Sequence, residues 1–276
     1  MSKRLLGLGT NSQFGISDEK QAELFSRAGF DASFLCWGYG TSVKEFSDIL
    51  KKNHLIFQSV HAPYIHMNDI WHGNREKSET AIKELLNCLF DCIRNEVPIM
   101  VMHAFIGFED HSPCNAGIER IGKIIKAAEG SGVKIAFENT EGEEYLDAVM
   151  NAFRNDKNVG FCWDSGHEIC YNKSADLLKK YGDRMLCTHL NDNMGIKDPD
   201  GKITYFDDLH LLPFDGIADW NSIAERLKNI NYTGVLTFEL NTVSKPGRHE
   251  NDRYFSMPIA EYISVAYSRA LKVALL

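Results

Sequence analysis

The segments Ile99-Met100-Val101-Met102-His103 and Lys134-Ile135-Ala136-Phe137-Glu138 show the pattern that decides the fold. Each is a short, nearly continuous apolar run that ends on one ionisable side chain. Strands of a parallel sheet are buried on both faces, so apolar residues occupy consecutive positions along them. We therefore predict that both segments are strands of a parallel sheet.

Six other segments share this pattern, and helical patterns separate them. The eight predicted strands are Arg4–Leu8, Ala32–Cys36, Ile56–His61, Ile99–His103, Lys134–Glu138, Gly160–Asp164, Met185–His189 and Gly234–Glu239. Apolar residues three or four apart form stripes from Ile82 to Ile93 and from Ile118 to Ala128, as expected for helices that lie on a sheet. The other predicted helices are Asp18–Ala28, Val43–Asn53, Glu143–Asn155, Ala175–Tyr181, Trp220–Ile230 and Ile259–Leu275.

Eight strands that alternate with eight helices predict an α/β fold of the (β/α)8 TIM barrel type. The chain has 276 residues, close to the roughly 250 residues typical of this barrel. An open doubly wound sheet would usually have fewer strands, and no GxGxxG motif follows the first strand. We expect a single domain over residues 1–276.

The composition narrows the class of protein. Hydrophobic residues make up 44% and charged residues 25% of the chain, as in ordinary globular proteins. The net charge of −8 offers no basic footprint for nucleic acid. There is no long apolar run and no signal-peptide pattern, and the seven cysteines lack CxxC spacing. We expect a cytoplasmic protein without a membrane partner; a homo-oligomer is compatible with these features.

Ionisable residues end most of the predicted strands. The set consists of His61, His103, Glu138, Asp164, His189 and Glu239, with His167 three residues after Asp164 and with Asp208 and His210 in the loop after the seventh strand. The carboxyl ends of the strands of a TIM barrel converge on one mouth, where active sites are built. We therefore predict that these side chains form one site.

Imidazole and carboxylate side chains together favour a divalent metal ion such as Mn, Zn, Co or Mg. No cysteine belongs to the set, which disfavours a structural zinc. Two carboxylates from different strands can also act as acid and base on opposite faces of a substrate.

With these motifs the chain resembles the xylose isomerase-like TIM barrels, a superfamily of sugar and sugar-phosphate isomerases and epimerases that also contains endonuclease IV. The isomerase and epimerase branch implies one metal ion on Glu138, Asp164, His189 and Glu239. It also implies that Glu138 and Glu239 move a proton at the carbon beside a carbonyl. His167 matches a substrate-binding histidine of that branch.

Two details bear on the ketose 3-epimerases within this branch. Glu144, six residues after Glu138, matches a glutamate of those enzymes that lies next to the metal ligands without being one of them. They also have an arginine six residues after the metal-binding histidine, and Gly195 stands at that position here.

The endonuclease IV branch implies three zinc ions. Its ligands correspond to His61, His103, Glu138, Asp164, His167, His189, Asp208, His210 and Glu239. The run from Asp208 to Gly216 instead resembles the sugar enzymes, and the short loop Gly38–Thr41 after the second strand has no basic residue. Lys245 and Arg248, after the eighth strand, are placed to bind a phosphate, which a sugar phosphate would also supply.

The leading prediction is a metal-dependent sugar or sugar-phosphate isomerase or epimerase that binds a small molecule and no nucleic acid. The alternatives are a zinc-dependent phosphodiesterase acting on abasic DNA with more than one zinc ion, a metal-dependent dehydratase or lyase of the same fold, and a non-catalytic carbohydrate-binding protein.

Overall fold

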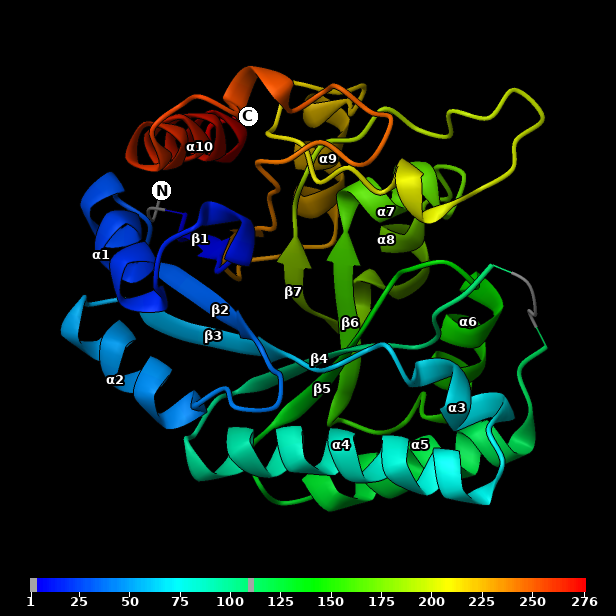
Figure 1. The fold of residues 1–276 in the computed structure, drawn as a ribbon. Helices are drawn as coiled ribbons and strands as arrows, with labels where there is room; N and C mark the ends of the chain where they lie inside the picture. The colour runs from blue at the N-terminus through cyan, green and yellow to red at the C-terminus, as the bar shows by residue number, and fades with distance from the viewer. Residues whose placement is uncertain (1–3, 109–111) are drawn as a thin grey trace.

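Eight parallel strands form the centre of the molecule in the computed structural model, which describes residues 4–108 and 112–276 (Figure 1). They are β1 (Leu6–Gly9), β2 (Ala32–Cys36), β3 (Ile56–His61), β4 (Ile99–His103), β5 (Lys134–Glu138), β6 (Val159–Asp164), β7 (Met185–His189) and β8 (Leu236–Phe238). Each strand from β2 to β7 pairs with its predecessor in the chain, and β8 pairs with β1. A bridge closes the circle, in which the N–H of Leu190, after β7, donates to the carbonyl of Thr237 in β8 at 2.7 Å. The predicted TIM barrel is confirmed.

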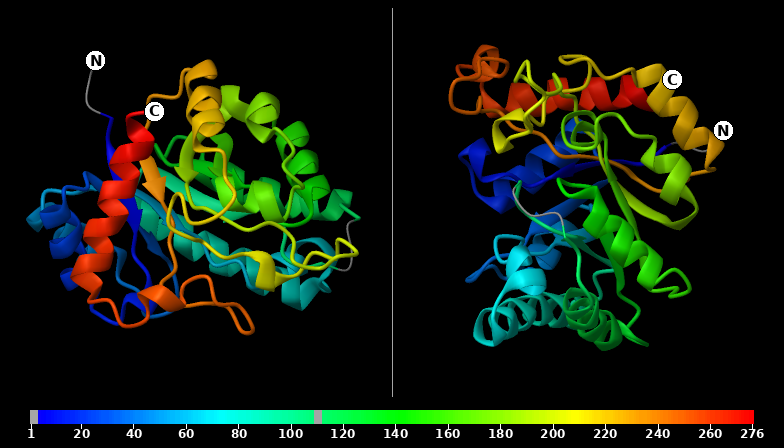
Figure 2. Two further views of the ribbon diagram at one scale, coloured as in Figure 1. Left: turned by 90° about the horizontal axis from the view of Figure 1, so that it is seen from above. Right: turned by 90° about the vertical axis from the view of Figure 1, so that its right-hand side faces the viewer.

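Helices surround the strands, as Figure 2 shows from two directions. They are α1 (Asp18–Ala28), α2 (Val43–Lys52), α3 (Met67–His72), α4 (Arg75–Arg94), α5 (Asn115–Ala128), α6 (Glu143–Ala152), α7 (Ser165–Cys170), α8 (Leu177–Tyr181), α9 (Trp220–Asn229) and α10 (Ile259–Ala274). Among the described residues, no helix combines the length and the hydropathy that crossing a membrane would require.

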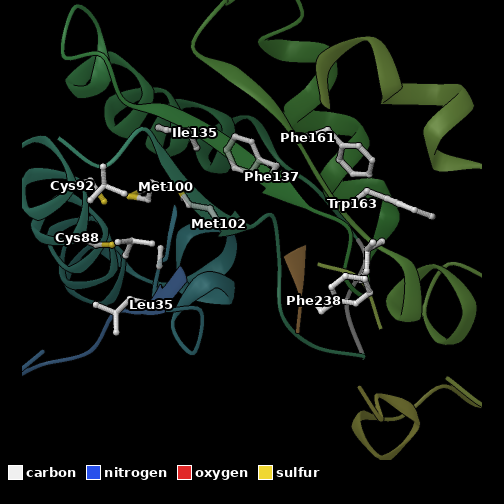
Figure 3. Close-up of a cluster of buried hydrophobic side chains, with 14 of the residues drawn as sticks. Leu35, Cys88, Cys92, Met100, Met102, Ile135, Phe137, Phe161, Trp163 and Phe238 are labelled. Carbon is white, nitrogen blue, oxygen red and sulfur yellow. The ribbon is translucent and has the colours of Figure 1, made fainter. Parts of the chain in front are cut away.

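Alternate residues of each strand face the helices or the barrel interior. On β4, Met100 and Met102 point toward Cys88 and Cys92 of α4 (Figure 3). The residue between them, Val101, belongs to a separate buried cluster inside the barrel. The members of this interior cluster are Val101, Ala136, Cys162 and Cys187.

The predicted strands agree with the structure except at three of them. β1 begins and ends later than Arg4–Leu8, β6 begins one residue before Gly160, and β8 is shorter than Gly234–Glu239. Glu239 therefore stands one residue beyond its strand. Helix predictions missed α3 and α7, each of six residues, because such short helices show no complete apolar period.

Candidate metal centre

The interior positions of four neighbouring strands carry the predicted ligands. His103, Glu138, Asp164 and His189 each follow a member of the interior cluster by two residues, so they face the same side of the sheet. All four strands run in parallel, so the four side chains meet at the carboxyl end of the barrel. Because of the two-residue period, the last side chains of these four apolar strands point inward and form one buried polar cluster.

Glu138 lies at the middle of this cluster and is not exposed at all. One carboxylate oxygen, Oε2, lies 3.1 Å from Nε2 of His61 and 3.5 Å from Nε2 of His103, while Oε1 lies 2.9 Å from Nδ1 of His189. Burial alone would raise the pKa of Glu138, but His189 and the other imidazoles hold that pKa well below its usual range. Glu138 is therefore a carboxylate at neutral pH.

His189 links the two predicted acid–base residues. Its Nδ1 lies 2.9 Å from Oε1 of Glu138 and 3.0 Å from Oε2 of Glu239. Burial alone would lower the pKa of His189, but Glu138 and Glu239 raise it well above its usual value. A positive charge is thus stabilised between the two carboxylates.

The inner set fits a divalent ion. One ligand atom each from Glu138, Asp164, His189 and Glu239 lies within 4.8 Å of every other. Uncompensated carboxylates are costly to bury, so this set requires positive charge, which a divalent cation supplies directly. Three carboxylates and one imidazole are donors that Mn²⁺, Zn²⁺ and Co²⁺ accept.

The outer residues form two further groups around the inner set. One group consists of His61 and His103 with Glu138, and the other of His167 and His210 with Asp164. Eight of the nine residues expected from the two branches of the superfamily therefore come together.

Asp208 completes the second of these groups. Its Oδ1 lies 2.8 Å from Nε2 of His210 and 3.3 Å from Nε2 of His167. Burial would lower the pKa of His210, but Asp208 and Glu239 raise it to about 9.

Backbone carbonyls orient three of the imidazoles. Nδ1 of His61 lies 2.8 Å from the carbonyl of Ala62, and Nδ1 of His167 lies 2.9 Å from the carbonyl of Asn139. Nδ1 of His210 lies 3.2 Å from the carbonyl of Glu239. A carbonyl only accepts, so Nδ1 carries the proton in each case and Nε2 faces the carboxylates. Such outer contacts fix the tautomer of a metal-binding histidine.

The structure adds detail on the surroundings of Glu144 and Cys162. Glu144 is exposed in the first turn of α6 and lies in none of the clusters of candidate ligands. Glu141 is buried instead, and its Oε1 accepts the N–H of Gly107 at 2.8 Å. Cys162, a thiol beside Glu138 and His189, was not expected in the set. Burial raises the pKa of Cys162 well above its usual value, which favours the protonated thiol in the metal-free protein.

Three aromatic residues that the sequence patterns did not single out pack against the histidines. Phe34 stacks on His189 with ring centres 4.6 Å apart, and Tyr64 stacks on His103 at the same distance. The ring of Tyr171 lies 5.1 Å from that of His167. Phe34 lies two residues before Cys36 in β2, so the two-residue period of a strand places it on the barrel side. This period could have identified Phe34 from the sequence.

A groove of roughly 1270 Å³ has one of the candidate ligands, Glu239, in its lining. Cys36, Leu240 and residues of α1 and α2 also line it. Lys52 is the one lysine or arginine among the described residues that line it, and its Nζ is 2.8 Å from Glu19. Five carboxylate side chains line the groove, namely Asp18, Glu19, Glu45, Asp48 and Glu239.

The two cations expected to bind a phosphate are already paired. Arg248 is buried, with Nη2 2.7 Å from Glu250 and Nη1 3.4 Å from Asp207. Lys245 lies 3.7 Å from Asp208 and 4.5 Å from the ring centre of Tyr205. Neither side chain is held ready for a phosphate.

A (β/α)8 barrel with a carboxylate–histidine cluster at the carboxyl ends of its strands defines the class of this protein. The chain belongs to the xylose isomerase-like TIM barrel family, whose sequence model matches residues 22–255. Over 148 residues it is 32% identical to the uncharacterized protein y4fM of Sinorhizobium fredii. That alignment covers 50% of this chain and 44% of the relative, so the chain spans under half of the relative's length.

Two solved structures share the fold. One is the IolI protein with a bound zinc atom, with a TM-score of 0.74, 20% identity and 97% coverage of both chains. The other is D-psicose 3-epimerase from Clostridium cellulolyticum H10 with D-tagatose, with a TM-score of 0.72 and 14% identity. That comparison covers 98% of this chain and 99% of the epimerase. At these identities the likeness concerns the fold.

Proposed function

We propose that this protein is a metal-dependent sugar or sugar-phosphate isomerase or epimerase. The observation that carries the proposal is the contact of both Glu138 and Glu239 with the same nitrogen of His189, at 2.9 and 3.0 Å. Two carboxylates that flank one cationic position, beside an open groove, suit the removal and return of a proton on opposite faces of a substrate.

Glu138, Asp164, His189 and Glu239 would hold the metal ion. When bound, a divalent ion there supplies Lewis-acid polarisation of a carbonyl and its neighbouring hydroxyl. Glu239 reaches the groove, with a side chain 24% exposed, while Glu138 is buried beneath it. One glutamate removes the proton from the carbon beside the carbonyl, and the other returns a proton to it. His167 and Tyr64 would bind substrate hydroxyls beside the centre.

The similar structures support this choice of substrate. D-psicose 3-epimerase was solved with D-tagatose and also with D-fructose. The first test is therefore the metal-loaded protein with a panel of free ketoses and their phosphate esters, and sugar products are identified by chromatography. A dehydratase or lyase would instead release a product that has lost water or been cleaved.

Replacement of Glu138 by Gln tests the mechanism. We expect the E138Q variant to keep the fold, seen by circular dichroism, and to lose turnover. Activity retained in this variant would refute the glutamate-pair mechanism, whichever sugar is used.

A second candidate is a multi-zinc phosphodiesterase acting on abasic DNA. The observation in its favour is that all nine residues matching the three-zinc set of endonuclease IV meet at one centre. The distribution of basic residues argues against this candidate. The segments 10–17, 37–42, 62–74 and 139–142 contain no lysine or arginine. Basic residues follow β7 and β8, but Lys245 and Arg248 there are already paired with carboxylates, whereas DNA affinity depends on cations that neutralise phosphates.

The number of bound ions separates the two candidates. We expect one tightly bound ion per chain by anomalous scattering or elemental analysis. Three ions together with cleavage of an abasic duplex would establish the phosphodiesterase.

A further inference from the structure

Asp164 is the inner-set carboxylate with both oxygens held by donors outside the set. The backbone N–H of His167 donates to Oδ1 at 2.6 Å, and the side-chain amide of Asn191 donates from Nδ2 to Oδ2 at 2.7 Å. Neither Asp164 nor Asn191 is exposed. The carboxylate plane is therefore fixed before any ion arrives.

Asn191 reaches Asp164 because the chain places it there. It follows His189 by two residues, and its backbone is fixed from both sides by the hydroxyl of Ser165. That hydroxyl donates to the carbonyl of Asn191 at 2.7 Å and accepts its N–H at 3.0 Å. The run 189–191 thus supplies both His189, a candidate ligand, and Asn191, which supports Asp164 at the end of the neighbouring strand β6.

Gly166 provides the space for this amide. A Cβ atom at Gly166 would lie 1.8 Å from Oδ1 of Asn191. No left-handed backbone conformation is needed there, because Gly166 lies within α7. The absence of a side chain at Gly166 is therefore a steric requirement of the amide position.

We propose that Asn191 is a positioning residue for the metal centre and that its side chain orients the Asp164 carboxylate toward the ion. Because Gly166 has no side chain, it leaves the room that the Asn191 amide needs. The inference rests on the proposed function only in requiring that a metal ion binds Asp164, and it does not depend on the substrate. Partners that orient ligands of a metal commonly change its affinity by about 10- to 100-fold when they are removed.

The test compares Asn191→Ala with Asn193→Ala. Asn193 is a matched control because it is equally buried but bonds only to backbone groups, the carbonyl of Asp207 and the N–H of Gly195, each at 2.9 Å. Zinc affinity of the full chain is measured by competition with a chelating indicator, and the coordination by the absorption spectrum of the Co²⁺ form. Melting temperatures of the metal-free variants report any general structural damage.

We expect N191A to weaken zinc binding by about 10- to 100-fold and to change the Co²⁺ spectrum, while N193A changes neither. Equal zinc affinities of the two variants would overturn the proposal. Asn191→Leu has a similar size and removes the donor, so we expect it to weaken zinc binding as well; unchanged affinity there also overturns the proposal.

Gly166→Ala provides an independent arm because it leaves Asn191 in the sequence. We expect it to weaken zinc binding, and the double variant with N191A to bind zinc no more weakly than N191A alone, since both changes remove the same contact. Fully additive losses would contradict the proposal. Loss of zinc in N191A from a chain that turns over no sugar would leave this inference standing and the proposed function refuted.

Discussion

His189 lies against Glu138 with Nδ1 2.9 Å from Oε1, and neither side chain is more than 1% exposed. Protonation of the histidine and occupation by a metal ion are therefore competing ways to supply positive charge at one place. Metal binding and pH should be linked in this protein because a ligand must lose its proton before it binds an ion.

The pH dependence of stability follows from the raised histidine pKa values. The pKa of His210 is about 9 in the fold, against about 6.5 in an unfolded chain. Because the folded value is raised, its stabilisation is present below pH about 6.5 and is lost as the pH rises to about 9, at up to about 1.4 kcal/mol per pH unit. Urea unfolding of the metal-free protein across this range measures the loss. We expect a flatter profile for His210→Asn, and an unchanged profile would contradict the assignment.

Gly9 controls the position of the ring that stacks on His189. A Cβ there would lie 2.4 Å from two ring carbons of Phe34. We expect Gly9→Ala to push Phe34 toward His189, to destabilise the fold by about 1–3 kcal/mol and to weaken metal binding. Gly38→Ala is the control, since its added Cβ would have Thr41 Oγ1 as nearest neighbour, at 3.7 Å. Equal stabilities of the two variants would disprove the steric explanation.

Tyr64 offers a face and a hydroxyl at the mouth of the site. Its ring is 42% exposed and parallel to His103 within 17°. We expect Tyr64→Ala to raise the KM for a ketose roughly tenfold by removing a stacking surface, and Tyr64→Phe to have a smaller effect. Phe255→Ala, at a ring that is 85% exposed, should leave the KM unchanged. A KM unaffected in Tyr64→Ala would exclude substrate contact.

The buried Arg248 joins two loops of the mouth through its ion pair with the buried Asp207, and it also pairs with the partly exposed Glu250 in its own loop. We expect Arg248→Met to cost about 3–5 kcal/mol, because the carboxylates lose their buried cation. Arg253→Met should cost at most about 1 kcal/mol, because the Arg253 side chain is 53% exposed. Denaturant unfolding of both variants measures the difference, and equal costs would show that the buried pair contributes nothing special.

The barrel and most of the site were predictable because they depend on local patterns. Apolar runs ending on His or Asp identified β4 and β6, and the two-residue period carried their last residues inward. Glu144 was singled out by resemblance to the ketose 3-epimerases, whereas the buried glutamate of this segment is Glu141, which lies two residues before α6. The role of Asn191 depends on a contact between two strands and on free space at Gly166, which no pattern along one strand records.

The interior cluster of Val101, Ala136, Cys162 and Cys187 lies directly beneath the candidate ligands in the barrel. We expect the small side chains of this cluster to determine how deeply the ligands lie, and therefore how far they are removed from water. We expect Ala136→Val to raise the exposure of Glu138 and His189 without changing any candidate ligand, and a crystal structure of the variant measures that exposure. The exposure of the ligands to water would then depend on the residues beneath them as well as on the ligands themselves.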